Sequence, residues 1–213
     1  TYVEDVVEAL VRVLDLGPNL VGTQIGLVVP DITVGRQTAA SGKRNAPYIT
    51  AESIADLPRY AGKFNGRIIG IDPEAGIMQK TREAMQAYGL ADYELIRGSE
   101  VSMTAELSDA IRKQRWIVVT GWIPHWMFAR WKLKFLDDPK NVFGSKEEIH
   151  TIVRKGLEDD MPDVYRLLDN FSWSPEDLGQ LMIWIKEDHG MYPGEKAMRY
   201  MRFHEEQIES WLP

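Results

Sequence analysis

The 213-residue sequence contains no cysteine, which excludes disulfide bonds and thiolate chemistry. It has no uninterrupted apolar run of about 18 residues or more, so no segment has the composition of a membrane-spanning helix. Basic residues are outnumbered by acidic ones, and the net charge of −7 argues against a nucleic-acid-binding surface. Hydrophobic residues make up 44% of the chain and charged residues 27%, so we expect a folded globular protein rather than a disordered one.

Catalytic and metal-binding motifs are also missing from the sequence. The GxSxG, Walker A and GxGxxG strings do not occur. The four histidines are scattered without metal-ligand spacing, at His125, His150, His189 and His204. Adjacent carboxylates at 159–160 lie where a helix is expected to begin, and helix capping explains them. We therefore expect neither an enzyme nor a bound cofactor, and a small α/β enzyme is the least supported interpretation.

Strands and helices are predicted to alternate in the middle of the chain. β-Branched runs predict strands at 66–72, 93–98 and 116–122. Amphipathic stretches predict helices at 76–90 and 102–114, the second capped by Ser102. Such alternation with short connections is typical of an α/β unit with a mostly parallel sheet.

The flanking regions have a different pattern. Apolar spacing predicts an amphipathic helix over residues 2–16, closed by Gly17 and Pro18, and then a strand at 23–30. Small and polar residues at 31–50 predict a mobile loop, followed by a short helix. A strand is predicted at 148–156. Helices are predicted at 161–171, at 174–188 with Ser174 and Asp177 in capping-box spacing, and at 194–212.

Gly76 is the first candidate binding residue. It opens the helix that follows the strand at 66–72, and the N–H groups of a first helical turn point outward and attract anions. A glycine there lets a ligand approach the backbone closely. An ordinary strand-to-helix turn would produce the same pattern, so both interpretations stay open.

Trp122 is the second candidate. It follows Gly121 at the C-terminal end of a predicted strand, and ligands of open α/β sheets bind beside such ends. Its π face suits a cation that has no N–H to donate. Core packing is the alternative, and it is our interpretation of Trp126, Phe128 and Trp131. An anion site and a π face together would fit a small zwitterion with a carboxylate and a quaternary ammonium.

Four strings of this sequence resemble the glycine betaine-binding proteins of osmoprotectant ABC transporters. They are "DLGPNLVGTQIGLVVP", "GIDPEAGIM", "IVVTGWIPHWMFARWKLKFLDDPK" and "EIHTIVRKGLEDDMPDVYRLLDNFSWSPEDL". They occur in the order and with the spacing of that family, and the resemblance extends from about Val13 to Trp211. Only residues 31–49 look like an insertion.

The resemblance implies an α/β fold of the type II periplasmic-binding-protein class. Residues 66–140 would form one complete ligand-binding lobe, and residues 1–65 with 141–213 the hinge strands and an incomplete second lobe. The ligand's carboxylate would lie on the backbone N–H groups of Gly76 and Ile77, and Trp122 would be one tryptophan of an ammonium cage. The implied partners are glycine betaine or a similar zwitterion and an ABC permease. The implied location is the periplasm or the exported cell surface, although no signal sequence is visible here.

The sequence departs from the family in one respect. Family members carry a "YVNW"-like strand and an "AWLPTTH"-like segment that supply two more cage tryptophans and a histidine, and neither is found here. Trp173, Trp184 and Trp211 lie on predicted helices and are not assigned to the cage. We therefore interpret the chain as a fragment or truncated member whose incomplete lobe forms a homodimer. The alternative is a half-lobe interaction module that binds another polypeptide instead of a betaine.

Overall fold

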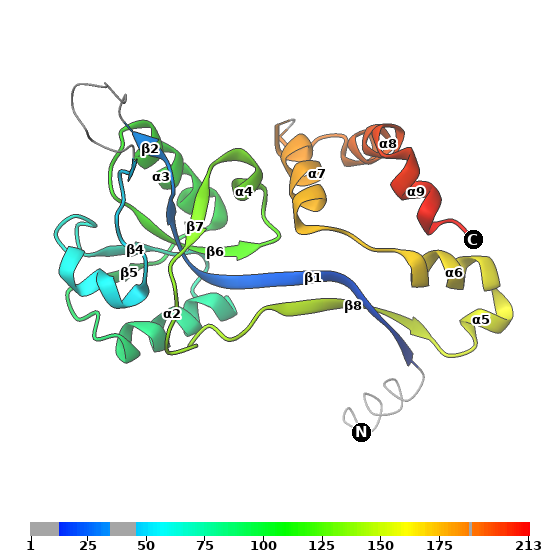
Figure 1. Cartoon of the computed structure of the whole chain (residues 1–213), viewed down its shortest axis with the longest axis horizontal. Coiled ribbons are helices and arrows are strands. Elements are labelled where there is room, and N and C mark those ends of the chain that lie inside the picture. The colour runs from blue at the N-terminus through cyan, green and yellow to red at the C-terminus, as the bar shows by residue number, and fades with distance from the viewer. Residues whose placement is uncertain (1–12, 35–45, 188) are drawn as a thin grey trace. The chain divides into compact units, whose positions relative to one another are not determined.

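The computed structural model describes residues 13–34, 46–187 and 189–213 (Figure 1). These residues divide into two compact units. The larger unit is formed by residues 24–145, and the smaller unit by residues 13–23 together with 146–213. The lobe predicted at 66–140 falls within the larger unit. In the described part of the chain, no helix has both the length and the hydrophobicity needed to cross a bilayer.

The larger unit is built on a mixed sheet in the order β5-β4-β6-β1-β7 (Figure 1). Its strands are β1 (Val13–Pro30), β4 (Arg67–Ile69), β5 (Glu94–Ile96), β6 (Val118–Ile123) and β7 (Leu133–Phe135). β4 pairs in parallel with β5 and β6, whereas β1 runs antiparallel to β6 and β7. The three predicted central strands are confirmed. β7 was not predicted, and it becomes a strand by pairing with β1.

The helices of the larger unit follow the predicted alternation. They are the 3₁₀ helix η1 (Ile54–Tyr60), α2 (Gly76–Ala87), α3 (Glu100–Arg112) and the short α4 (Trp126–Arg130). The predicted cap at Ser102 is wrong, because α3 begins earlier, at an N-cap formed by Ser99. Ser99 Oγ accepts the Ser102 N–H at 3.1 Å, and Ser102 Oγ accepts the Ser99 N–H at 2.8 Å. Ser102 therefore completes a reciprocal capping box instead of starting the helix.

The core of the larger unit lies between the sheet and its helices. Its fully buried members include Leu27 of β1, Ile68 of β4, Met78 of α2 and Val118 of β6. The predicted loop at 31–50 contains the two short paired strands β2 (Thr33–Val34) and β3 (Ala46–Pro47). Residues 35–45, where the remainder of that loop prediction falls, lie outside the described residues.

In the smaller unit the first half of β1 pairs antiparallel with β8 (Glu147–Arg154). The helix predicted over residues 2–16 is wrong for residues 13–16, which belong to β1, and its other residues lie outside the described part of the chain. The Gly17-Pro18 pair does not end a helix. It marks a register shift between Asp15 and Pro18, with Gly17 at a φ of +95°.

An ion pair joins the two strands at this irregularity. Asp15 Oδ1 accepts the Gly17 N–H at 2.8 Å, and Asp15 Oδ2 lies 2.9 Å from His150 Nδ1. The hydrogen bond to Asp15 raises the pKa of His150, and the Gly17 N–H together with His150 lowers the pKa of Asp15. Asp15 and His150 therefore form a cross-strand contact where the sequence pattern suggested a helix end.

The helical part of the smaller unit was largely predicted. Its helices are α5 (Leu157–Asp160), α6 (Pro162–Asn170), α7 (Pro175–Glu187), α8 (Pro193–Phe203) and α9 (Glu205–Trp211). Half of the predicted capping box is confirmed, since Ser174 Oγ accepts the Asp177 N–H at 3.0 Å. The Asp177 carboxylate binds the Ser174 hydroxyl, which donates to Oδ2 at 2.7 Å. The single helix predicted at 194–212 is wrong. The chain breaks it at His204, whose Nδ1 lies 2.9 Å from the Tyr200 carbonyl.

The tryptophans of the smaller unit form an aromatic cluster. Trp173 lies 5.4 Å from Trp211 and 5.1 Å from Tyr200 between ring centroids, and Trp184 lies 6.1 Å from Tyr200. Trp184 and Trp211 are on helices as predicted. Trp173 is not on a helix. It makes a β-bridge to Leu20 just before α7.

Candidate functional site

The turn between β4 and α2 sets the geometry of the predicted anion site. Asp72 Oδ1 accepts the Glu74 N–H at 2.9 Å, and the Asp72 carbonyl accepts the Ala75 N–H at 3.0 Å. This tight turn leaves Ala75 extended, with φ −65° and ψ 137°, as the N-cap of α2. Gly76 is therefore the first helical residue, as the sequence predicted.

Gly76 and Ile77 present the N–H groups of the first turn of α2. The Met78 N–H donates to the Ala75 carbonyl at 2.9 Å, whereas the N–H groups of Gly76 and Ile77 donate no hydrogen bond within the described residues. Gly76 is exposed, and a Cβ added there would meet no atom within 4 Å. Ile77 is 7% exposed and belongs to the core. A buried side chain thus anchors two N–H groups at the positive end of the helix dipole.

A surface hollow of about 350 Å³ opens beside this end of α2. Arg82 and Arg97 line it together with Pro73, Glu74 and Gln79. The two guanidinium groups outnumber the one carboxylate of this lining, Glu74, so the hollow adds net positive charge near the helix N-terminus, which favours an anion there.

Trp122 lies at the same edge of the sheet. β4 and β6 are parallel, so the turn after β4 and Trp122, the last residue but one of β6, both lie at the C-terminal ends of strands. Trp122 is half-buried, stands opposite Ile25 of β1 and packs against the core to which Ile77 belongs. The structure thus places all three predicted binding residues in the larger unit, at one edge of its sheet.

The other aromatic residues after β6 are packing residues, as predicted. Trp126 is 7% exposed, and its Nε1–H donates to Glu100 Oε1 at 3.0 Å. The Trp126 and Trp131 ring centroids are 5.6 Å apart, and Phe128 stacks on Phe135 at 5.2 Å. These contacts join α4 to the sheet and to α3.

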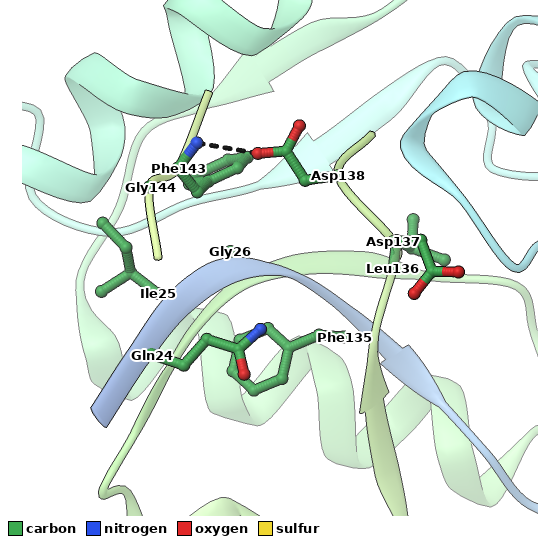
Figure 2. A pocket seen from close by; sticks show the side chains of 9 residues that line it. All are labelled: Gln24, Ile25, Gly26, Phe135, Leu136, Asp137, Asp138, Phe143 and Gly144. Carbon is green, nitrogen blue, oxygen red and sulfur yellow. Dashed lines mark hydrogen bonds between the residues drawn. The ribbon is translucent and has the colours of Figure 1, made fainter. Parts of the chain in front are cut away.

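A small cavity of about 130 Å³ lies elsewhere in the larger unit, between β1 and the segment after β7 (Figure 2). Its lining comes from Gln24, Ile25 and Gly26 of β1 and from residues 135–138, 143 and 144. None of the three predicted binding residues lines it. The cavity is smaller than the usual range of roughly 300–1,000 Å³ for small-molecule sites.

The carboxylate at this cavity already has partners. Figure 2 shows Asp138 Oδ2 accepting the Phe143 N–H, at 2.8 Å, and Asp138 Oδ1 accepts the Tyr88 hydroxyl at 2.5 Å. Burial, reinforced by Asp138, raises the pKa of Tyr88 to about 12. Tyr88 is the C-cap of α2, so this network holds one end of the helix while the other end presents Gly76 and Ile77.

Sequence reasoning missed His125 and Glu100. His125 is 3% exposed, and its ring centroid lies 4.5 Å from that of Trp122. His125 Nε2 lies 3.3 Å from Glu100 Oε1. A lone histidine without ligand spacing gave no signal, although its position three residues after Trp122 could have suggested a contact. Among the described residues, no cluster of three or more His, Asp or Glu could hold a metal ion.

A family model described as the substrate-binding domain of ABC-type glycine betaine transport systems matches residues 2–202. The chain belongs to this family. The resemblance predicted from the four sequence strings is thereby confirmed. The family and the relatives described below are named as binding proteins of transport systems, not as enzymes.

Individual relatives agree with the family match. The glycine betaine/carnitine transport binding protein GbuC of Listeria monocytogenes is 43% identical over 175 residues, which are 81% of this chain and 56% of GbuC. Lactococcal OpuAC, solved in a closed form with glycine betaine, is 37% identical, with a TM-score of 0.71 over 94% of this chain and 71% of that one. Borrelia burgdorferi ProX is 35% identical, with a TM-score of 0.71 over 97% and 72%.

Two statements follow from these matches. The α/β fold is that of the type II periplasmic-binding-protein class, as predicted. The chain spans a little over half the length of GbuC, 56%.

Proposed function

We propose that this chain forms part of the substrate-binding component of an ABC transporter and captures glycine betaine or a related quaternary ammonium compound. The carboxylate of the ligand accepts the N–H groups of Gly76 and Ile77, and its ammonium lies on the indole face of Trp122. The domain acts in the periplasm or at the exported cell surface and delivers its ligand to an ABC permease. Residues 66–140 supply the ligand-binding lobe.

The observation that carries this proposal is the placement of two complementary groups at one sheet edge. The N-terminus of α2 provides positive potential for a carboxylate, and Trp122 provides a π face for a cation. Because β4 and β6 are parallel and share one core, both groups belong to the same rigid part of the chain. GbuC is named for glycine betaine and carnitine, and OpuAC was solved with glycine betaine, which supports the same class of ligand.

Replacing Trp122 with alanine is expected to raise the dissociation constant for glycine betaine about two- to thirtyfold, the range of one cation–π contact. Trp122 also packs partly against the core, so some loss of melting temperature is expected as well. The affinity is measured by titrating the protein with glycine betaine and monitoring the amide signals of Gly76 and Ile77 in NMR spectra. The melting temperature is measured by calorimetry.

Trp116→Ala is the matched control. Trp116 lies just before the other end of β6, is also half-buried and packs against the same core, where it contacts Phe64 at 5.1 Å. It should lose a similar amount of stability and keep its affinity. Equal affinities for both variants would contradict the role of Trp122.

The alternative of a polypeptide-binding module has one observation in its favour, an apolar groove in the smaller unit. The groove has a volume of about 420 Å³ and is lined by side chains of α6 to α9, with the rings of Phe171, Trp173 and Trp211 among them. On α8, Met198 and Phe203 are 57% and 68% exposed. Exposed apolar patches of this kind mark interaction sites. The occupant that we propose is a second copy of the chain, whose exposed α8 side chains have the apolar chemistry of the groove.

The isolated chain is therefore expected to form a dimer. Light scattering at high protein concentration should give twice the mass of the 24.4 kDa chain. Phe203→Ser, which removes an exposed ring without opening the core, should shift the mixture toward monomer. If the parent chain and Phe203→Ser were both monomeric and bound no hydrophobic dye, the groove would not be a dimer interface.

A further inference from the structure

The imidazole of His125 lies between two tryptophan rings of the larger unit. Its centroid is 4.5 Å from that of Trp122, with the ring planes 79° apart, and 5.4 Å from that of Trp126, with the planes 31° apart. His125 is 3% exposed, whereas Trp122 is half-buried. The half-buried ring of the proposed ligand site therefore rests against a buried ring.

One nitrogen of the imidazole makes a hydrogen bond, and the other faces a carboxylate of a neighbouring helix without a hydrogen bond of good geometry. Nδ1 accepts the Met127 N–H at 3.1 Å, which makes His125 the N-cap of α4. A neutral imidazole that accepts at Nδ1 carries its proton on Nε2. Nε2 lies 3.3 Å from Glu100 Oε1, at the first residue of α3. The same Oε1 accepts the Trp126 indole N–H at 3.0 Å, so α3 and α4 together fix the ring.

We propose that His125 is a positioning residue for the ligand site, holding the Trp122 indole at the angle at which its face meets a quaternary ammonium. This inference rests on the proposed function and names a residue that acts through Trp122 without touching the ligand. A cation–π contact requires the cation over the ring face, so a ring that can turn loses part of the contact.

The polar contacts of His125 also explain why the ring is a histidine. Protonation of Nδ1 would break the N-cap bond to Met127, so the geometry favours the neutral ring. A neutral ring beside Trp122 does not repel a cationic ligand, and the nearby Glu100 carboxylate adds negative charge on the protein side. Tryptophan orientation and local charge are therefore set by one buried side chain.

Two substitutions at this position separate positioning from stability. His125→Asn retains an acceptor at the N-cap, where asparagine is favoured, but removes the ring beside Trp122. His125→Phe retains a ring and removes both polar contacts. We expect His125→Asn to weaken glycine betaine binding by at least about threefold, and His125→Phe to melt at a lower temperature while keeping its affinity within about twofold.

The test records the affinity for glycine betaine, the melting temperature and the nuclear Overhauser contacts between the Trp122 indole and its neighbouring side chains in the ligand-free chain. Chemical shifts alone do not serve, because losing a ring whose centroid is 4.5 Å away changes the indole shifts even if the indole stays in place. Positioning predicts that the indole contacts change in His125→Asn and persist in His125→Phe. Affinity that falls in step with melting temperature in both variants would overturn the proposal, as would unchanged indole contacts in His125→Asn. Because these contacts are measured without ligand, they test the proposal even if the parent chain binds no betaine, and that result would count against the proposed function instead.

Discussion

Replacing Gly121 with alanine is expected to lower the melting temperature of the larger unit by roughly 5–10 °C, because overpacking a core costs typically about 1–3 kcal/mol. Gly121 of β6 stands opposite Gly26 of β1. A Cβ added at Gly121 would lie 2.4 Å from Val28 Cγ2 and 2.8 Å from Met127 Cε. Both neighbours are fully buried, so neither can turn into solvent. Calorimetry on the purified variant measures the change.

Two other glycines of the larger unit serve as graded controls. A Cβ at Gly62 would meet no atom within 4 Å, so Gly62→Ala should melt like the parent chain. A Cβ at Gly26 would lie 3.0 Å from Phe135 Cδ1, the edge of a half-buried ring that can shift, so Gly26→Ala should fall between. If Gly121→Ala had the same melting temperature as Gly62→Ala, Gly121 would not be in close contact with Val28 and Met127.

Gly76→Pro is expected to weaken glycine betaine binding by about tenfold or more with little change in melting temperature. Proline removes one N–H of the proposed carboxylate site, and a hydrogen bond to a charged group contributes about 1.5–3 kcal/mol. The backbone accepts the change, because Gly76 is the first residue of α2 and Ala75 before it is extended at φ −65° and ψ 137°. The Trp122 indole signals report the remaining affinity.

Gly76→Ala is the control for this experiment, since it retains the N–H and adds a methyl group where no protein atom lies within 4 Å. It should melt as the parent chain does and bind glycine betaine more tightly than Gly76→Pro. Loss of binding in both variants would indicate that the ligand needs the space above Gly76 instead of its N–H. Parent-like binding by Gly76→Pro would remove Gly76 from the site.

The alternating part of the fold could be predicted because local sequence decides it. The strands at β4 and β6 are β-branched runs, and α2 begins where the turn after Asp72 leaves the backbone free to enter a helix. The start of β1 could not be predicted, because residues 13–16 continue an apolar helical period. Only pairing with β8, more than a hundred residues later, makes these residues a strand. Such tertiary contacts override local propensity.

The candidate site was predictable to the extent that its groups lie at element ends. A helix N-terminus at Gly76 and a tryptophan after Gly121 can both be located in the sequence, while Ile77 came from the family resemblance. The support of Trp122 was not predictable. It depends on Glu100 of α3 reaching His125, 25 residues apart in sequence and 3.3 Å apart between Oε1 and Nε2. The N-cap of α3 was also not predictable from sequence. Ser99 and Ser102 are both residues that can cap a helix, and only the folded structure shows that the cap is Ser99.

The central claim is that one ligand joins the α2 N-terminus to the Trp122 face. NMR titration of the isotopically labelled chain with glycine betaine, acetate and tetramethylammonium tests it most directly. One cation–π contact contributes about 0.5–2 kcal/mol and the helix end about 0.3–2 kcal/mol, so we expect a dissociation constant of about 1 mM or weaker for these two contacts. Glycine betaine should shift the amide signals of Gly76 and Ile77 and the indole signals of Trp122 with one common constant. Acetate should shift only the two amides, and tetramethylammonium only the indole. The account would be contradicted if, in a folded chain, glycine betaine at concentrations well above the millimolar range left the amide signals or the indole signals unshifted.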